Sequence, residues 1–272
     1  MKIVSKEDKS SNLGLPNNVP YLALNASNGN AGVVFAVARS PILDSSFFKT
    51  RGIQIPPSVV PLSGRFTWFK TYLQSVCSTP RDCANRLGNS LIFLGDNEAN
   101  DIGYALTQGK SIEEVSTYVP LVTQALVDAT RELIKMGATR IALTGSAPLG
   151  CYPYILTALQ TNDPLAYDNL GCLKRVNNLI LSKNAALQAA ILKLKLEFPF
   201  INILYADIYG SGLGTSHCKL VVELEENITT TARGFVVVPE CPFALTQTDT
   251  YTGMAYTIPN RLTRDIFNFS FR

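Results

Sequence analysis

The sequence lacks long apolar runs and has very little histidine. No uninterrupted apolar stretch approaches the roughly 20 residues that a membrane-spanning helix needs, so we expect no membrane span. His217 is the only histidine of the chain, and no C-x2-C pair is present. A zinc site built on several such ligands is therefore excluded, and we expect no bound metal and no cofactor.

A strong charge of either sign is also absent. The chain has 24 Lys and Arg residues against 21 Asp and Glu residues, and the basic residues are scattered without a stripe. We therefore expect no nucleic-acid partner. With 46% hydrophobic and 17% charged residues over 272 positions, the composition is typical of a globular protein with a substantial core, in one large domain or two ordinary ones.

The compartment is left open by the residues themselves. The first twelve residues, MKIVSKEDKSSN, contain no apolar segment followed by a small-residue cleavage site, so we expect no signal peptide in this chain. Three N-x-[ST] acceptor sites point the other way, and they begin at Asn25, Asn227 and Asn268.

Cysteine spacing gives a second indication of secretion. Cys77 and Cys83 flank a short segment, and Cys151 and Cys172 bracket a loop. Local pairs of this kind form disulfides in secreted proteins, although reduced structural cysteines are the open alternative.

Short apolar runs alternate with helical patterns along most of the chain. Buried strands are predicted at residues 32–38, 90–94, 140–144 and 202–206. Helices are predicted over 65–76, from a cap at Ser78 to 88, from a capping box at Ser111 and Glu114 through a kink at Pro120 to Gly137, and over 173–198. This alternation indicates a parallel sheet with helices on both faces.

The last predicted helix and the segment after it differ in character. The leucines at positions 179, 187, 192, 194 and 196 are expected to pack in the core. From Ser211 onward the sequence has strand-like pieces but no strong helix. We therefore divide the chain into residues 1–210 and a divergent C-terminal segment, 211–272.

A series of short motifs occurs in one order along residues 12–210. They are Leu13-Gly-Leu-Pro16, Gly32-Val-Val-Phe-Ala-Val-Ala38, Cys77-Ser-Thr-Pro-Arg-Asp-Cys83, Ser90-Leu-Ile-Phe-Leu-Gly95, Asn100-Asp101, Pro148-Leu-Gly-Cys151, Gly171-Cys-Leu173 and Tyr205-Ala-Asp207. This series resembles the plant-type GDSL esterase/lipase family, a branch of the SGNH hydrolases.

The resemblance implies a fold, an activity and a location. The fold is a three-layer α/β/α sandwich with a central parallel sheet, and residues 1–210 would form a partial domain of this kind. The activity is hydrolysis of carboxylic esters, of lipids or of small molecules. The resemblance also implies secretion and favours the two disulfides, Cys77–Cys83 and Cys151–Cys172.

Acyl transfer of this kind needs a nucleophile, a base and donors for the developing negative charge. The family supplies a serine in Gly-Asp-Ser, a histidine with an aspartate three residues before it, and the amides of a glycine and an asparagine. Asn100 matches the asparagine, and Arg39 stands at the glycine position, where its backbone amide is the candidate donor. Ala99 also replaces a glycine that is usual in the family.

The nucleophile and the base are not found. No Gly-Asp-Ser string occurs, and because that string ends the family's first strand, we expect the sheet to lack this strand. Gly214, not an aspartate, stands three residues before His217, which we interpret as a structural or surface residue. Ser146 lacks the second glycine of a nucleophile elbow and is not assigned a catalytic role. Asp101 is interpreted as an acid that fixes its loop.

Three hypotheses follow from these observations. The first is a GDSL esterase/lipase-like protein that is catalytically impaired as written, with a small-molecule ester or lipid as its substrate. The second is a non-catalytic relative that binds esters or glycosides. The third concerns residues 211–272, which would reflect a truncated or rearranged coding sequence.

Overall fold

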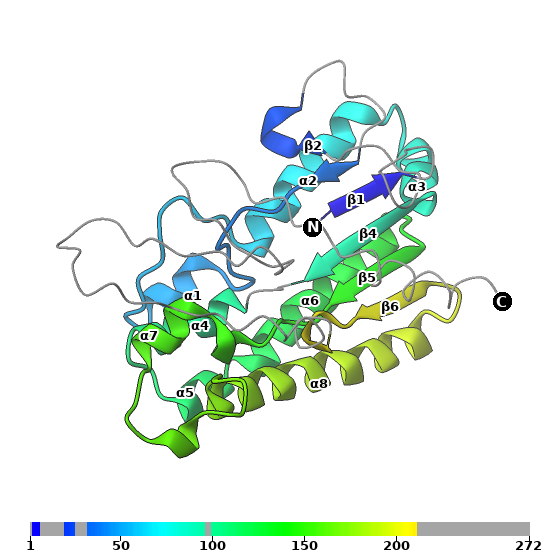
Figure 1. The fold of residues 1–272 in the computed structure, drawn as a ribbon. Coiled ribbons are helices and arrows are strands. Elements are labelled where there is room, and N and C mark those ends of the chain that lie inside the picture. Colours follow the sequence, from blue (N-terminus) through cyan, green and yellow to red (C-terminus); the bar gives the residue numbers. More distant parts are fainter. Residues whose placement is uncertain (1, 6–18, 25–31, 96–98, 211–272) are drawn as a thin grey trace, which may run out of the picture.

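The computed structural model describes residues 2–5, 19–24, 32–95 and 99–210, and all structural statements concern these residues. They form a sheet flanked by helices, as the alternation of elements predicted (Figure 1). The sheet has the strand order β2-β3-β1-β4-β5-β6. The strands are β1 (Lys2–Ser5), β2 (Val19–Pro20), β3 (Val33–Val34), β4 (Ser90–Gly95), β5 (Arg140–Thr144) and β6 (Asn202–Ala206).

Strands β4, β5 and β6 form the parallel part of the sheet. Ile92 pairs with Ile141, and Ile141 pairs with Ile203, so the three strands are in register. Four consecutive residues of β5, from Ile141 to Thr144, are buried. Continuous burial means that both faces of this strand are covered, as in a sheet with helices on either side.

Strand β1 occupies the place where the sheet was expected to lack a strand. It lies between β3 and β4 and runs antiparallel to both, with Lys2 opposite Phe93 and Ser5 opposite Ser90. The sheet is therefore mixed. Pairing with β1 gives hydrogen-bond partners to the backbone N–H and C=O groups along the facing edges of β3 and β4, which would otherwise be unpaired.

Eight α-helices surround the described sheet (Figure 1). They are α1 (Ser45–Lys49), α2 (Leu62–Val76), α3 (Pro80–Gly88), α4 (Asn100–Thr107), α5 (Ile112–Ser116), α6 (Val119–Lys135), α7 (Pro153–Ala158) and α8 (Lys174–Glu197). Short 3-10 turns also occur: η1 (Tyr21–Ala23) between β2 and β3, η3 (Leu149–Cys151) between β5 and α7, and η4 (Pro164–Ala166) between α7 and α8. The buried face of α2 is made by Phe66, Phe69 and Leu73, as the sequence spacing predicted.

Two hydrophobic clusters divide the core. One packs around the strands and includes Phe69, Ile92 and Leu133. The other lies beneath α4, α5 and α7 and includes Ile102 and Leu149. The second cluster supports the carboxyl edge of the sheet, where the candidate site lies.

Three local predictions need correction. The predicted strand 32–38 is reduced to Val33–Val34, because its neighbours β1 and β2 pair only with those two residues. The cap of α3 is Thr79, not Ser78, since the Thr79 hydroxyl accepts from the Asp82 amide at 3.1 Å. The predicted kink at Pro120 is a break between α5 and α6, and Pro120 lies in the first turn of α6, where its missing N–H costs nothing.

The leucines of α8 are the fourth correction. Leu179, Leu187 and Leu194 are buried as predicted, but Leu192 is 63% exposed and Leu196 is 84% exposed. The buried residues of α8 lie on the side that meets the sheet, and Leu192 and Leu196 lie on the other side. They are not core residues.

Two disulfides fasten helix ends. Cys77 at the end of α2 is bonded to Cys83 in α3, and Cys151 in η3 is bonded to Cys172 before α8. Both are the pairs expected from the sequence. Cys218 and Cys241, the three glycosylation acceptors and the whole of segment 211–272 lie outside the described residues. Within the described part, no helix has both the length and the hydropathy to cross a bilayer.

Candidate active site

The candidate site lies where β3 and β4 end at one edge of the sheet. After β3 the chain enters a loop of residues 35–44, and after β4 it enters α4, whose first residue is Asn100. The carboxyl ends of neighbouring strands are where open α/β sheets place their chemistry. Arg39 and Asn100, the two candidate donors predicted from the sequence, lie in these two segments, and the structure brings the segments together.

Asp101 fastens the loop to α4. Its carboxylate accepts from the backbone N–H of Ile42 and of Leu43, each at 2.8 Å, and the residue is fully buried. A buried carboxylate needs such donors, and charge-assisted bonds of this kind are stronger than neutral ones. The interpretation of Asp101 as a loop-fixing acid agrees with this geometry, although the loop it holds is that of residues 42 and 43.

Asn100 and Tyr104 hold the same loop nearer to β3, at Ser40 and Arg39. The Asn100 carboxamide donates from Nδ2 to the Ser40 carbonyl at 3.3 Å, and the Tyr104 hydroxyl donates to the Arg39 carbonyl at 2.8 Å. Residues four apart on a helix share one face, so both side chains reach the loop. Sequence reasoning missed Tyr104, and its spacing from Asn100 is the signal that could have found it.

Arg39 and Ala99 both adopt a left-handed backbone conformation. Their φ values are 62° and 50°, and they are the only non-glycine residues of the described part with positive φ. These are the two positions at which the sequence departs from a glycine. Since such conformations cost a residue with a Cβ atom about 1–2 kcal/mol, the backbone keeps a glycine-type turn despite the substitutions.

A second set of contacts supports the loop from α2 and from the segment just before it. Arg65, which is buried, donates from Nη2 to the Pro41 carbonyl at 2.9 Å. The Ser40 hydroxyl accepts from the Val60 amide at 2.9 Å. Residues 39–43 are therefore held from two helices, and the position of the Arg39 amide relative to Asn100 is fixed by the fold.

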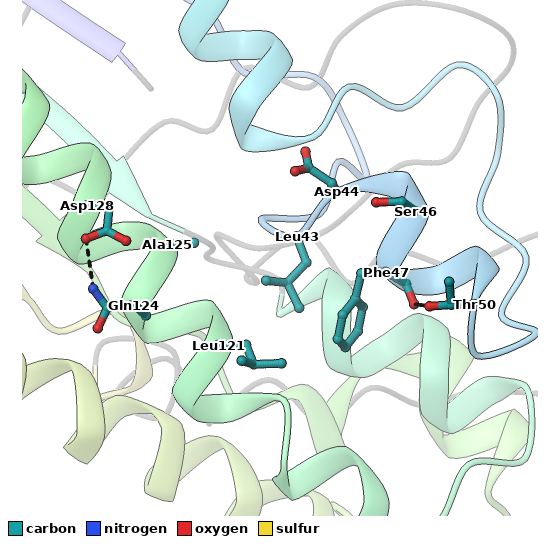
Figure 2. Close-up of a pocket in the computed structure, with 9 residues that line it drawn as sticks. All are labelled: Leu43, Asp44, Ser46, Phe47, Thr50, Leu121, Gln124, Ala125 and Asp128. Atoms are coloured by element: carbon teal, nitrogen blue, oxygen red, sulfur yellow. Dashed lines mark hydrogen bonds between the residues drawn. The ribbon is translucent and has the colours of Figure 1, made fainter.

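An open pocket of about 500 Å³ adjoins this loop. Figure 2 shows Leu43 and Phe47 facing Leu121 and Ala125 of α6, with Asp44 and Asp128 at its polar margin. Leu43 links pocket and site, because its side chain lines the pocket while its amide donates to Asp101. Apolar walls with a few polar groups are typical of small-molecule sites.

Charged and aromatic side chains stiffen one wall of the pocket. The Arg51 guanidinium lies 3.8 Å from the centre of the Phe47 ring, and Phe47 packs edge-on against Tyr118. The Tyr118 hydroxyl donates to Glu114 at 2.9 Å. Burial, followed by this bond and the charge of Glu114, raises the pKa of Tyr118 to about 12. The bond from Tyr118 is the largest cause of the lowered pKa of Glu114.

The remaining candidate residues do not join this site. Ser146 is fully buried, accepts from the Lys183 ammonium at 2.6 Å, and exchanges two backbone bonds with the Asn184 side chain, which supports a structural role. His217 lies outside the described residues, and the described part contains no histidine. It also contains no group of three or more His, Cys, Asp or Glu side chains that could hold a metal ion.

Strand β1 cannot replace the family's nucleophile-bearing strand. That strand would run parallel to β4 and end at the site. Because β1 is antiparallel, Ser5 lies opposite Ser90, the first residue of β4, at the far edge of the sheet.

The α/β fold, with a loop amide and a helix-borne carboxamide held at the carboxyl edge of its sheet, defines a protein of the SGNH-hydrolase class. Residues 14–230 match the sequence model of the GDSL-like Lipase/Acylhydrolase family. The chain therefore belongs to the GDSL-like lipase/acylhydrolase family.

Curated relatives agree with this assignment. An acetylajmalan esterase of Rauvolfia serpentina is 43% identical over 199 residues, which are 73% of this chain and 51% of the relative. A GDSL esterase/lipase of Arabidopsis thaliana is 39% identical over 183 residues, 67% of this chain and 56% of the relative. A sinapine esterase of Brassica napus is 38% identical over 201 residues, 73% of this chain and 52% of the relative. The chain thus spans about half the length of the curated relatives it matches.

Proposed function

We propose that this chain is a GDSL-type carboxylic ester hydrolase whose catalysis is impaired, because it keeps the oxyanion half of the site and lacks the nucleophile and the base. One observation carries the proposal. The loop of residues 39–43 is fastened to α4 by Asn100, Asp101 and Tyr104, with a left-handed turn at Arg39. Such a turn beside a carboxamide suits two donors aimed at one carbonyl oxygen.

A small-molecule ester is the proposed substrate class. Two of the matched relatives are named esterases, of acetylajmalan and of sinapine. The pocket beside Leu43 has the size and the apolar lining for one part of such an ester. We further propose that the partial hydrolase-like domain comprises residues 1–210 and that 211–272 form a divergent segment, of which the family match covers residues 211–230. A related transcript carrying an Asp-x-x-His block in place of 211–272 would test this division.

Hydrolysis of a short-chain p-nitrophenyl ester by the purified, folded chain tests the proposal. We expect no turnover above the uncatalysed rate, and the same rate for His217→Ala. Activity that disappears in His217→Ala would mean a working site built around that histidine and would overturn the impairment. Supplying a polypeptide segment with Gly-Asp-Ser and a last block with Asp-x-x-His should restore activity, provided that Asn100 is intact. A matched Asn100→Ala chimera serves as the control.

A non-catalytic role in ester or glycoside binding is the second candidate, and the pocket of Figure 2 favours it. Calorimetric titration with a non-hydrolysed amide analogue of an ester tests for saturable binding. Ala125→Trp would fill the pocket and should abolish the heat of binding. Leu165→Trp, on an exposed 3-10 turn away from the pocket, is the matched control. Heat that is equal in both variants would remove this candidate.

A further inference from the structure

An apolar stripe runs along the solvent side of α8. Leu192 and Leu196 are 63% and 84% exposed, and Phe200, just after the helix, is 96% exposed. Leu181, at 46%, and Ala185 extend the stripe toward the start of the helix. Spacings of four and seven residues put Leu181, Ala185, Leu192 and Leu196 on one face of the helix, and Phe200 lies just beyond its end. We call this set the outer face of α8.

The outer face is rimmed by positive charge. On a helix, Lys193 and Lys195 fall on opposite sides of the stripe formed by Leu192 and Leu196, and both lysines are exposed. Lys135, at the end of α6, is exposed and close enough to lower the pKa of Glu197.

Glu197 is the one acidic residue of α8, and it is already engaged. The Arg131 guanidinium donates to it from Nε at 3.0 Å and from Nη2 at 2.8 Å, and this bond is the main cause of its lowered pKa. The end of α8 therefore presents leucines and a phenylalanine among cations whose nearest acid is neutralised by an arginine.

Charge decides between the occupants that could cover this face. In a second copy of the chain, two α8 helices would meet, and each brings exposed Lys174, Lys193 and Lys195, whereas Arg175 is already paired with Glu113. Like charges would then face each other across the contact. An anionic partner avoids this repulsion and adds attraction to every lysine.

We propose that the outer face of α8 docks on an anionic lipid surface, with Leu192, Leu196 and Phe200 at the boundary between headgroups and acyl chains. Each of these three side chains is more than half exposed, and lysines flank them. Exposed apolar side chains beside lysines are typical of amphipathic helices that lie in a membrane interface. Each lysine near an anionic bilayer strengthens the attraction, and the effect decreases with salt.

The C-terminal end of α8, which carries Leu192 and Leu196, lies at the end of the molecule opposite to α1 and α4 (Figure 1). The chain passes from the end of α8 into β6, whose first residue, Asn202, pairs with the first residue of β5, Arg140. Asn100, in contrast, follows the last residues of β4. Docking would therefore leave the candidate site facing away from the lipid, and the proposal is independent of catalysis.

Flotation of the full chain with lipid vesicles tests the inference. We expect binding to vesicles of phosphatidylcholine and phosphatidylserine, and at least roughly tenfold weaker binding to phosphatidylcholine alone. The double variant Leu196→Ser/Phe200→Ser should lose binding. Leu165→Ser, which changes a leucine that is 77% exposed elsewhere, is the matched control and should bind like the parent chain. Thermal unfolding compared among all three proteins shows whether the fold is intact.

Several outcomes would overturn the inference. Absence of flotation with the mixed vesicles would do so directly. Flotation that Lys193→Glu/Lys195→Glu abolishes but Leu196→Ser/Phe200→Ser leaves unchanged would indicate adsorption by charge alone. A dimer in sedimentation equilibrium that Leu196→Ser dissociates would assign the outer face to a second copy of the chain.

Discussion

At the residue scale, Arg39 combines a required backbone shape with a side chain that does not favour it. Its φ of 62° is the left-handed conformation, and its carbonyl is fixed by Tyr104. The guanidinium carbon lies 5.9 Å from the centre of the Tyr104 ring, a modest cation–π contact at an exposed position. The turn is therefore maintained by its hydrogen bonds and not by the preference of the residue.

Arg39→Gly should therefore stabilise the chain. Relief of the left-handed conformation gains about 1–2 kcal/mol, and the greater freedom of glycine in the unfolded chain offsets about 0.4–1 kcal/mol of this. We expect a net increase of about 0.5–1 kcal/mol in the free energy of unfolding, measured by urea denaturation. Arg39→Ala removes the guanidinium but keeps the strain, so it should not stabilise. Equal effects of the two substitutions would show that the side chain and not the backbone is responsible.

Asp101→Asn should be strongly destabilising. The carboxylate accepts from two backbone N–H groups, and an amide can replace only one of these acceptors while its NH2 faces the other donor. Losing a charge-assisted bond and leaving a buried donor unpaired costs about 2–4 kcal/mol. Ser40→Ala, which removes a neutral acceptor from the Val60 amide, should cost only about 1 kcal/mol. Similar losses in both variants, measured in urea, would argue against the anchoring role of Asp101.

At the element scale, the junction between α5 and α6 carries a pH-dependent contribution to stability. The folded chain holds the Tyr118 proton more tightly than the unfolded chain, since its pKa rises from 10.0 to about 12. Between these values the unfolded state binds fewer protons, so the free energy of unfolding falls as pH rises. Below pH 10 the contribution is fully present.

Tyr118→Phe should remove the part of the alkaline loss of unfolding free energy that comes from the Tyr118 hydroxyl. We expect the difference in unfolding free energy between parent and variant to shrink as pH rises from 9 to about 11.5, measured by urea denaturation. Glu114→Gln, which removes the charge but keeps an acceptor for the hydroxyl, should reduce the pH dependence without abolishing it. A difference that is constant with pH would contradict the proposed linkage.

Sequence patterns predicted the elements better than their details. The capping box at Ser111 was half right, because the Ser111 hydroxyl accepts from the Glu114 amide at 3.1 Å while the Glu114 carboxylate accepts from Tyr118 instead. The exposed Leu192 could not be distinguished from its buried neighbours, because helical spacing alone does not show which face meets the sheet. Asn100 and Arg39 were placed by motif, whereas Tyr104 required the loop geometry to be known.

At the scale of the whole molecule, the arrangement of the sheet agrees with the proposal that the chain keeps one half of its site. The proposed oxyanion half depends on β3, β4 and α4, and on the contacts of Asn100, Asp101 and Tyr104 with residues 39–43. The nucleophile depends on a parallel strand between β3 and β4, and that place holds the antiparallel β1. An antiparallel strand can form the backbone hydrogen bonds that β3 and β4 need without ending at the site.

Ile3→Pro tests whether β1 completes the sheet in this way. Ile3 pairs with Val33 on one side and with Ile92 on the other, so it is central in the ladder. Proline removes a backbone donor there and is found essentially only on edge strands or at bulges, so we expect a loss of about 3 kcal/mol or more in unfolding free energy. Ile3→Val, which keeps the backbone donor, is the matched control and should unfold at a higher urea concentration than Ile3→Pro. If Ile3→Pro unfolds at the same urea concentration as Ile3→Val, strand β1 does not contribute to the sheet. A stable protein would then have open edges on β3 and β4, and a parallel strand carrying Gly-Asp-Ser could be inserted between them without displacing any residue of this chain.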